Sequence, residues 1–278
     1  MSGNKGKKRS FAQELCVKSA GRAMQRAGML WPGCRVGVAV SGGVDSFVLL
    51  KTLQIRQGIV PFPFEIMALH LNPGFDPQSH AALPGWLARH GIASHVEVTD
   101  YGPEAHSEKN LRRSACFRCA WLRRKRLFEL CARYKLTHLA LGHNADDLVQ
   151  TFFLNLCRNG RVDGMHMNES FFGGGLHLIR PLLLVEKKYI VKAARQWALP
   201  VWANACPSAG HTARSAMSAT LEQLYGVTQG HHRHHVGGDQ IPELAGVVRG
   251  AEGRKPDARR GPDSPRPHTP LTGPGKRT

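Results

Sequence analysis

The sequence lacks any run of about eighteen uninterrupted apolar residues, the length that a membrane-spanning helix requires. Its first ten residues are basic and lead into an amphipathic segment rather than an apolar one, so they do not resemble a signal peptide. These absences exclude a membrane-embedded or exported class of protein. We therefore expect no membrane partner and a cytoplasmic location.

Acidic residues are also scarce. Twenty Asp and Glu stand against 38 Lys and Arg, which gives a formal net charge of +18. Such an excess attracts polyanions, because each phosphate that a protein neutralises releases condensed counterions. Basic residues crowd the segment 112–126, whereas aromatic residues make up only 7% and do not alternate with them as in base-stacking strips. The composition predicts a nucleic-acid partner.

The cysteine content argues against a set of disulfide bonds. The seven cysteines are odd in number and widely spaced in a chain without an export signal. A disulfide framework is therefore not expected, and the thiols are free to bind metal or to handle sulfur.

Short β-rich runs alternate with helical segments along most of the chain. We expect strands at 35–40, 65–71, 94–99, 137–141 and 179–184, and helices at 11–30, 47–53, 79–90, 116–135, 145–156 and 186–198. This alternation predicts an α/β fold with a doubly wound parallel sheet. The predicted organisation is a basic helical segment at 1–30, the α/β domain at 31–228, and a disordered tail at 229–278, where Pro, Gly and Arg replace core-forming residues.

The most informative segment follows the first predicted strand and opens a helix. It reads Val40-Ser41-Gly42-Gly43-Val44-Asp45-Ser46. The glycine pair allows a sharp turn, and backbone N–H groups with the two serine hydroxyls can hold phosphate oxygens at the positive end of the helix. A carboxylate at Asp45 among phosphates requires a bridging cation, for which Mg²⁺ is suited. A Gly-Lys-Ser/Thr phosphate loop after a strand is absent.

This string resembles the PP-loop of the ATP pyrophosphatases, and two further segments fit the same family. Residues 142–147 (GHNADD) resemble its GHxxDD signature, and residues 179–183 (IRPLL) its RPL segment. The resemblance implies that ATP binds with its pyrophosphate on the loop and leaves as AMP. The turns after parallel strands should converge at one edge of the sheet. The implied nucleotide-binding residues are Val40, Ser41, Gly42, Gly43, Val44, Asp45, Ser46, His70 and Gly142, and the implied catalytic residues are Asp45, His143, Asp146 and Asp147.

Two of these residues also have a plain structural interpretation. One of the aspartates could be only the N-cap of the following helix. A lone histidine such as His143 is more often structural than catalytic.

Cys116 and Cys119 form a CxxC pair at the start of the basic helix. Such a pair can be a redox couple, half of a zinc site or part of an iron–sulfur site. No second closely spaced pair exists, but His211, five residues after Cys206, could complete a zinc site.

The order of these motifs resembles the tRNA 2-thiocytidine synthetase family over roughly residues 35–225. That resemblance implies a [4Fe–4S] cluster held by Cys116, Cys119 and Cys206, with one iron open for an extra sulfur. The chain departs from the family at Ala209, where a further cysteine is usual. The four cysteines that match no ligand position are expected to pack in the interior; they are Cys16, Cys34, Cys131 and Cys157.

The resemblance implies an enzyme that adenylates a base carbonyl of tRNA and replaces the oxygen with sulfur, with ATP, Mg²⁺ and a [4Fe–4S] cluster as cofactors. Candidate contacts to tRNA phosphates are Arg118, Arg123, Arg124, Arg126 and Arg180. Besides tRNA, candidate partners are a sulfur donor, either a cysteine desulfurase or sulfide, and a second copy of the chain. Two rivals share the loop: a tRNA lysidine synthetase, which needs no cysteine triad, and a non-catalytic adenine-nucleotide sensor, which does not need Asp45, Asp146 and Asp147 together.

Overall fold

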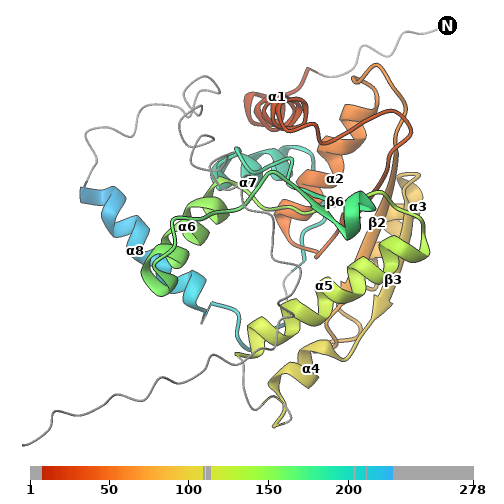
Figure 1. The fold of residues 1–278 in the computed structure, drawn as a ribbon. Helices are drawn as coiled ribbons and strands as arrows, with labels where there is room; N and C mark the ends of the chain where they lie inside the picture. The colour runs from red at the N-terminus through yellow and green to blue at the C-terminus, as the bar shows by residue number, and fades with distance from the viewer. Residues whose placement is uncertain (1–7, 109, 111–113, 203–204, 211, 228–278) are drawn as a thin grey trace, which may run out of the picture.

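The computed structural model describes residues 8–108, 110, 114–202, 205–210 and 212–227 (Figure 1). His211 and the tail at 229–278, both named by the sequence predictions, lie outside these residues. The strands are β1 (Arg35–Ala39), β2 (Glu65–Asn72), β3 (Ala93–Val98), β4 (His138–Ala140), β5 (Asn168–Phe171) and β6 (Leu176–Ile179). The helices are α1 (Phe11–Arg26), α2 (Val44–Gln57), α3 (Leu83–Arg89), α4 (Tyr101–His106), α5 (Ala115–Arg133), α6 (Ala145–Asn159), α7 (Lys187–Gln196) and α8 (Ala213–Val227).

The sheet has the order β3-β2-β1-β4-β6-β5. The first five strands in this order run parallel to one another, and β5 pairs antiparallel with β6 at the edge. The chain winds outward in both directions from β1 and β4, so the sheet is doubly wound, as the sequence predicts. The carboxyl ends of β1 and β4 lie side by side, and this is the switch point where ligands bind in open α/β sheets.

Several elements of the sequence prediction need correction. The fifth strand was expected at 179–184, but β6 ends at Ile179 and residues 181–184 form turns. Pro181 has no N–H to donate to a strand ladder, which explains why the strand cannot continue through it. No helix was expected at α4 or α8 and no strand at β5, yet the structure contains all three.

Helices cover both faces of the sheet. On one face α1, α2 and α7 pack together over a core that includes Phe47, Leu49 and Ile190. On the other face α5 places Leu127, Leu130 and Cys131 against Leu69 and Leu139. The helix α6 buries none of its residues, and in Figure 1 it lies beside α8. The side-chain amide of Gln150 on α6 donates to the hydroxyl of Ser218 on α8 at 2.7 Å.

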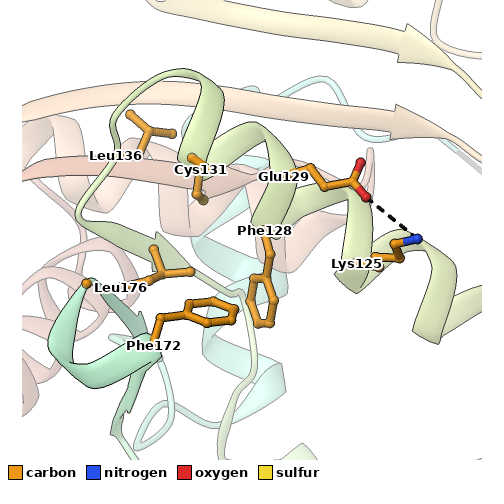
Figure 2. Close-up of a pocket in the computed structure, with 9 residues that line it drawn as sticks. Lys125, Phe128, Glu129, Cys131, Leu136, Phe172 and Leu176 are labelled. Carbon is orange, nitrogen blue, oxygen red and sulfur yellow. Dashed lines mark ion pairs between the residues drawn. The ribbon is translucent and has the colours of Figure 1, made fainter.

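An apolar cavity of about 510 Å³ lies between the second half of α5 and the starts of β4 and β6 (Figure 2). Phe128, Leu136, Phe172 and Leu176 line it. The cavity is therefore at the amino edge of the sheet, where the parallel strands begin. Among the described residues, no helix combines the length and the apolar character needed to cross a bilayer.

Candidate functional site

The loop after β1 is held in a ready conformation by its own serines. Ser46 is buried and its hydroxyl donates to the carbonyl oxygen of Gly43 at 2.7 Å, while it accepts the N–H of Ser41 at 3.2 Å. Gly43 is the N-cap of α2 and has no side chain to satisfy the first amides of the helix. These amides point out of a helix N-terminus, which is the arrangement that binds phosphate groups.

Gly42 must be a glycine for two reasons. Its φ of +88° lies in the left-handed region, and a Cβ at this position would approach the His80 imidazole to 2.7 Å. Its carbonyl oxygen accepts the N–H of Trp202 at 3.1 Å. The loop is thus packed from behind by two residues that lie far from it in the sequence.

The turn after β4 lies directly on this loop. A Cβ at Gly142 would approach the carbonyl carbon of Asp45 to 3.1 Å, so the two backbones touch. Asn144 donates its side-chain N–H to Asp45 at 3.0 Å. The structure therefore brings together the two motifs that the sequence predicted to converge.

The N-cap of α6 is not one of the aspartates, although the sequence suggested one. Asn144, not an aspartate, is the N-cap, and its side chain accepts the N–H groups of Asp146 and Asp147. Asp147 completes the capping box by accepting the N–H of Asn144 at 3.1 Å. Asp146 instead reaches across to α7 and accepts the N–H of Lys187 at 2.8 Å.

Lys187 is a site residue that the sequence did not reveal. Its ammonium group forms an ion pair with Asp45, so a cation already neutralises the carboxylate that faces the phosphate loop. A signal was available, because Lys187 opens the helix that follows β6 and the ends of parallel strands converge at this edge. The sequence could not show which carboxylate it meets.

The two candidate histidines are neutral at pH 7. Burial lowers the pKa of His70 to about 4, and its Nδ1 is bonded to the carbonyl oxygen of Val40 at 2.7 Å. Burial lowers the pKa of His143 to about 3, and the positive charges of Arg180, Arg214 and Arg124 lower it further. A neutral His143 that accepts a hydrogen bond from Arg180 at 3.2 Å is suited to orient a group rather than to carry charge.

Asp147, like His143, is influenced by the positive charge of Arg214. Burial raises its pKa, whereas the bond from Asn144 and the nearby guanidinium of Arg214 oppose that rise. Arg214, on α8, approaches Asp147 to 3.4 Å. Arg214 is therefore a second residue whose place in the site only the fold reveals.

Two cysteines of the predicted cluster, Cys116 and Cys206, lie within electrostatic range of the third, Cys119. Cys119 is partly buried, and burial raises its pKa; negative charge on Cys206 and Cys116 would raise it further, while Arg123 opposes the rise. The fold thus brings Cys206 within electrostatic range of Cys119, although 87 residues separate the two (206 − 119). Within the described part of the chain, however, no three His, Cys, Asp or Glu side chains already form a compact metal-binding group.

The other cysteines follow the prediction with one exception. Cys16, Cys34 and Cys131 are buried, as expected of packing residues, but Cys157 is exposed near the end of α6. That helix buries none of its residues, so a cysteine on it has no core to enter.

Of the five arginines predicted to contact tRNA, two lie toward the site, two form ion pairs with glutamates, and one is buried. Arg124 is exposed and acts on the pKa of His143, while Arg123 acts on those of Cys119 and His70, so both lie toward the site. Arg126 is held by two bonds to Glu97, at 2.7 and 2.9 Å. Arg118 is paired with Glu104 at 2.8 Å.

Arg180 does not fit the role of a phosphate contact. It is 8% exposed and its guanidinium is bonded to His143, Glu169 and the carbonyl oxygen of His166. We therefore assign Arg180 to the orientation of His143.

The fold and the two touching turns define a class of protein, the PP-loop nucleotide-binding enzymes. The chain belongs to this family: the model of the PP-loop domain matches residues 22–205.

Curated relatives narrow the family further. The chain is similar to the tRNA-cytidine(32) 2-sulfurtransferase of Geobacter sulfurreducens, with 34% identity over 195 residues that cover 70% of this chain and 76% of the relative. It is 34% identical to that of Methylococcus capsulatus over 214 residues, or 76% of this chain and 73% of the relative. Among solved structures, a U34-tRNA thiolase of Methanococcus maripaludis has the same fold, with a TM-score of 0.63, 21% identity, and coverage of 90% of this chain and 85% of that chain.

Proposed function

We propose that the protein is an ATP-dependent tRNA 2-sulfurtransferase that acts on a cytidine. The observation that carries this proposal is the contact of the 41–46 loop with the 142–147 turn. The electrostatic influence of Cys116 and Cys206 on Cys119 supports a site made of the three thiols. A lysidine synthetase would require the loop but not the three thiols. The identity to curated tRNA-cytidine(32) 2-sulfurtransferases supports position 32 as the target.

The first half of the reaction uses the loop. The amides at the start of α2, with Ser41 and Ser46, bind the pyrophosphate of ATP. The C2 carbonyl oxygen of the cytidine attacks the α-phosphorus, the bond to the β-phosphate oxygen breaks, and pyrophosphate leaves. Asp45 would supply a hard oxygen ligand suited to Mg²⁺, and its pairing with the Lys187 ammonium supports a cation at this position.

The second half exchanges oxygen for sulfur without any net oxidation or reduction. A sulfide nucleophile attacks C2, the C2–O bond breaks, and AMP departs with the former carbonyl oxygen. The proposed role of His143, neutral and oriented by Arg180, is a hydrogen bond to the base or the α-phosphate. The positive charges of Arg180, Arg214 and Arg124 around it favour the negative charge that develops at phosphorus.

The residues around Cys119 fit a [4Fe–4S] cluster. Three thiols near a basic residue, Arg123, suit an anionic cluster with three protein ligands, and a structural zinc site would require a fourth ligand. When bound by Cys116, Cys119 and Cys206, the cluster would supply an iron atom able to carry the sulfide. Sulfide or a cysteine desulfurase is the proposed source of that sulfur.

The remaining proposals concern partners and place. Arg123 and Arg124 are the proposed contacts to tRNA phosphate, because they lie toward the site. We also propose a cytoplasmic location, where tRNA and reduced thiols occur together, and a homodimer as the assembly.

Product analysis with ATP labelled at the α-phosphate tests the ATP chemistry. With tRNA present, labelled AMP and unlabelled pyrophosphate should form in equal amounts. Labelled ADP would contradict the proposal, because it would mean cleavage between the β- and γ-phosphates.

A further inference from the structure

The segment that carries Cys206 is joined to the rest of the chain by two distant contacts. On the amino-terminal side, Trp202 donates its N–H to Gly42 of the phosphate loop at 3.1 Å, and its ring lies 5.5 Å from that of Phe47. On the carboxyl-terminal side, the Ser208 hydroxyl is 2.8 Å from Nε2 of His106, on α4. Cys206 lies between these two anchors, two residues before Ser208.

The roles of donor and acceptor at His106 follow from its other nitrogen. Nδ1 lies 2.9 Å from the carbonyl oxygen of Gly102, which can only accept, so Nδ1 carries the proton. In the neutral imidazole Nε2 is then an acceptor, and the Ser208 hydroxyl donates to it. The imidazole is further fixed by the Phe75 ring, 5.1 Å away and edge-on.

The helix α4 is itself firmly seated. The N–H of Gly102 donates to the carbonyl oxygen of Pro73 at 2.7 Å, and a Cβ at Gly102 would come within 2.5 Å of the Phe75 ring. The same helix presents Glu104 to Arg118 at 2.8 Å. Since Arg118 lies between Cys116 and Cys119, one short helix contacts both parts of the cysteine set.

We propose that α4 assembles the three-thiol site, with His106 as the positioning residue for Cys206 through Ser208 and Glu104 as the positioning residue for the CxxC turn through Arg118. This inference rests on the proposed function, because it concerns the cluster that the three cysteines would hold. It also gives Arg118 a role other than contact with tRNA. The bond from Ser208 to His106 and the pair of Arg118 with Glu104 hold the Cys206 segment and the CxxC turn to the same helix, which limits their separation.

The test measures iron and acid-labile sulfide retained by anaerobically reconstituted full-length protein, and the rate at which a chelator removes the iron. His106→Ala and Ser208→Ala each remove the same hydrogen bond, so each should speed iron release about two- to tenfold, as expected for one net hydrogen bond. The double variant should be no faster than the faster single variant, because both changes remove one interaction. His106→Gln, which keeps an acceptor in reach of Ser208, should restore much of the retention.

His90→Ala is a matched control. His90 also bonds a carbonyl oxygen four residues earlier through Nδ1, at 2.8 Å from that of Trp86, and it also lies against an aromatic ring. His90 bonds within its own helix and lies at the amino edge, just before β3, so iron release from this variant should match that of the wild type.

The outcomes separate this inference from the proposed function. If wild-type protein retains no iron and sulfide, the proposed sulfurtransferase with its cluster is wrong. If wild-type protein retains the cluster and the His106→Ala and Ser208→Ala variants release iron at its rate, the positioning role of α4 is wrong while the function stands.

Discussion

The two edges of the sheet are built from the same strands but have opposite chemistry. At the carboxyl edge Asp45, Asn144, Asp146 and Lys187 bond one another across three different loops. At the amino edge the Trp31 ring lies 4.1 Å from that of His138, and the apolar cavity of Figure 2 opens beside α5. The comparison teaches that convergent polar groups at the switch point, not an apolar cavity, locate the active site of this fold.

The edges also differ in what their ionic groups do. Arg35 and Glu65, at the starts of β1 and β2, form a pair at 3.0 Å that is largely exposed. Such a pair contributes little to stability and has nothing to act on. Lys187 and Asp45 form a pair of the same type at the carboxyl edge, but it faces the amides that would bind phosphate.

The largest effect is expected from Asp45→Asn. The change removes the charge that would hold Mg²⁺ and pair with Lys187, so AMP formation should fall about 10²–10³-fold, the usual range for loss of one group that stabilises the transition state. The melting temperature should change little, because Asn can still accept from Asn144. Glu65→Gln at the amino edge should leave AMP formation unchanged, and an equal loss in both variants would erase the contrast.

Lys187→Met should have the next largest effect. Loss of the ammonium leaves Asp45 without its ionic partner and removes a positive charge beside the bound phosphates, so kcat/KM for ATP should fall about 10–100-fold. Lys188→Met is the control, since Lys188 pairs with Glu186 and is mostly exposed. Steady-state kinetics with varied ATP would contradict the role of Lys187 if the two variants behaved alike.

Cysteine substitutions at the two edges should differ in the amount of iron that the protein binds. Cys206→Ala and Cys116→Ala should each reduce bound iron from about four per monomer to nearly none, as loss of one of three ligands implies. Cys131, which lines the amino-edge cavity and whose pKa burial raises to about 12, should be replaceable by Ala without loss of iron. Retention of one zinc in place of iron would point instead to a closed structural site.

The smallest effect concerns pH and the amino edge. Burial lowers the pKa of His138 to about 4, so between about pH 6.5 and pH 4 the unfolded chain binds a proton at this residue that the folded chain does not. The free energy of unfolding therefore falls as the pH drops through that window, by about 1–2 kcal/mol at pH 5 from this group alone.

His138→Phe tests that assignment. Phenylalanine keeps a ring against Trp31 but does not titrate, so the loss of stability between pH 7 and pH 5 should shrink by that amount in urea unfolding. Parallel curves for wild type and variant would mean that His138 is not the group concerned. AMP formation at pH 7.5 should be the same in both.

The sequence predicted the parts of the fold that local patterns specify. The runs at β1, β2 and β3 are β-rich and bounded by turn residues, and their positions were confirmed to within about two residues. β5 was missed because NESF is short and polar. Its hairpin depends on Phe172, Gly173 and Gly174, all at positive φ, and on pairing with β6. α4 was missed because Gly102 and Pro103 disfavour a helix, and its seat against Phe75 is a tertiary effect.

The site divides in the same way. The 41–46 loop and the 142–147 turn were predictable because each is one contiguous motif after a strand. Lys187, Arg214, Trp202 and His106 were not assigned to the site, because their partners lie between 67 and 160 residues away and only the fold brings them together. For the same reason Arg126 and Arg180 were predicted to contact tRNA, although each is held by carboxylates within the fold.

The most direct test of the central claim measures the incoming sulfur and the departing AMP in one experiment. Anaerobically reconstituted protein is incubated with tRNA, ATP and isotopically heavy sulfide, and the tRNA nucleosides are then analysed by mass spectrometry. The account predicts 2-thiocytidine that carries the heavy sulfur, with one AMP formed per modified cytidine. Unmodified cytidine despite AMP formation, or lysidine when lysine is added, would contradict it.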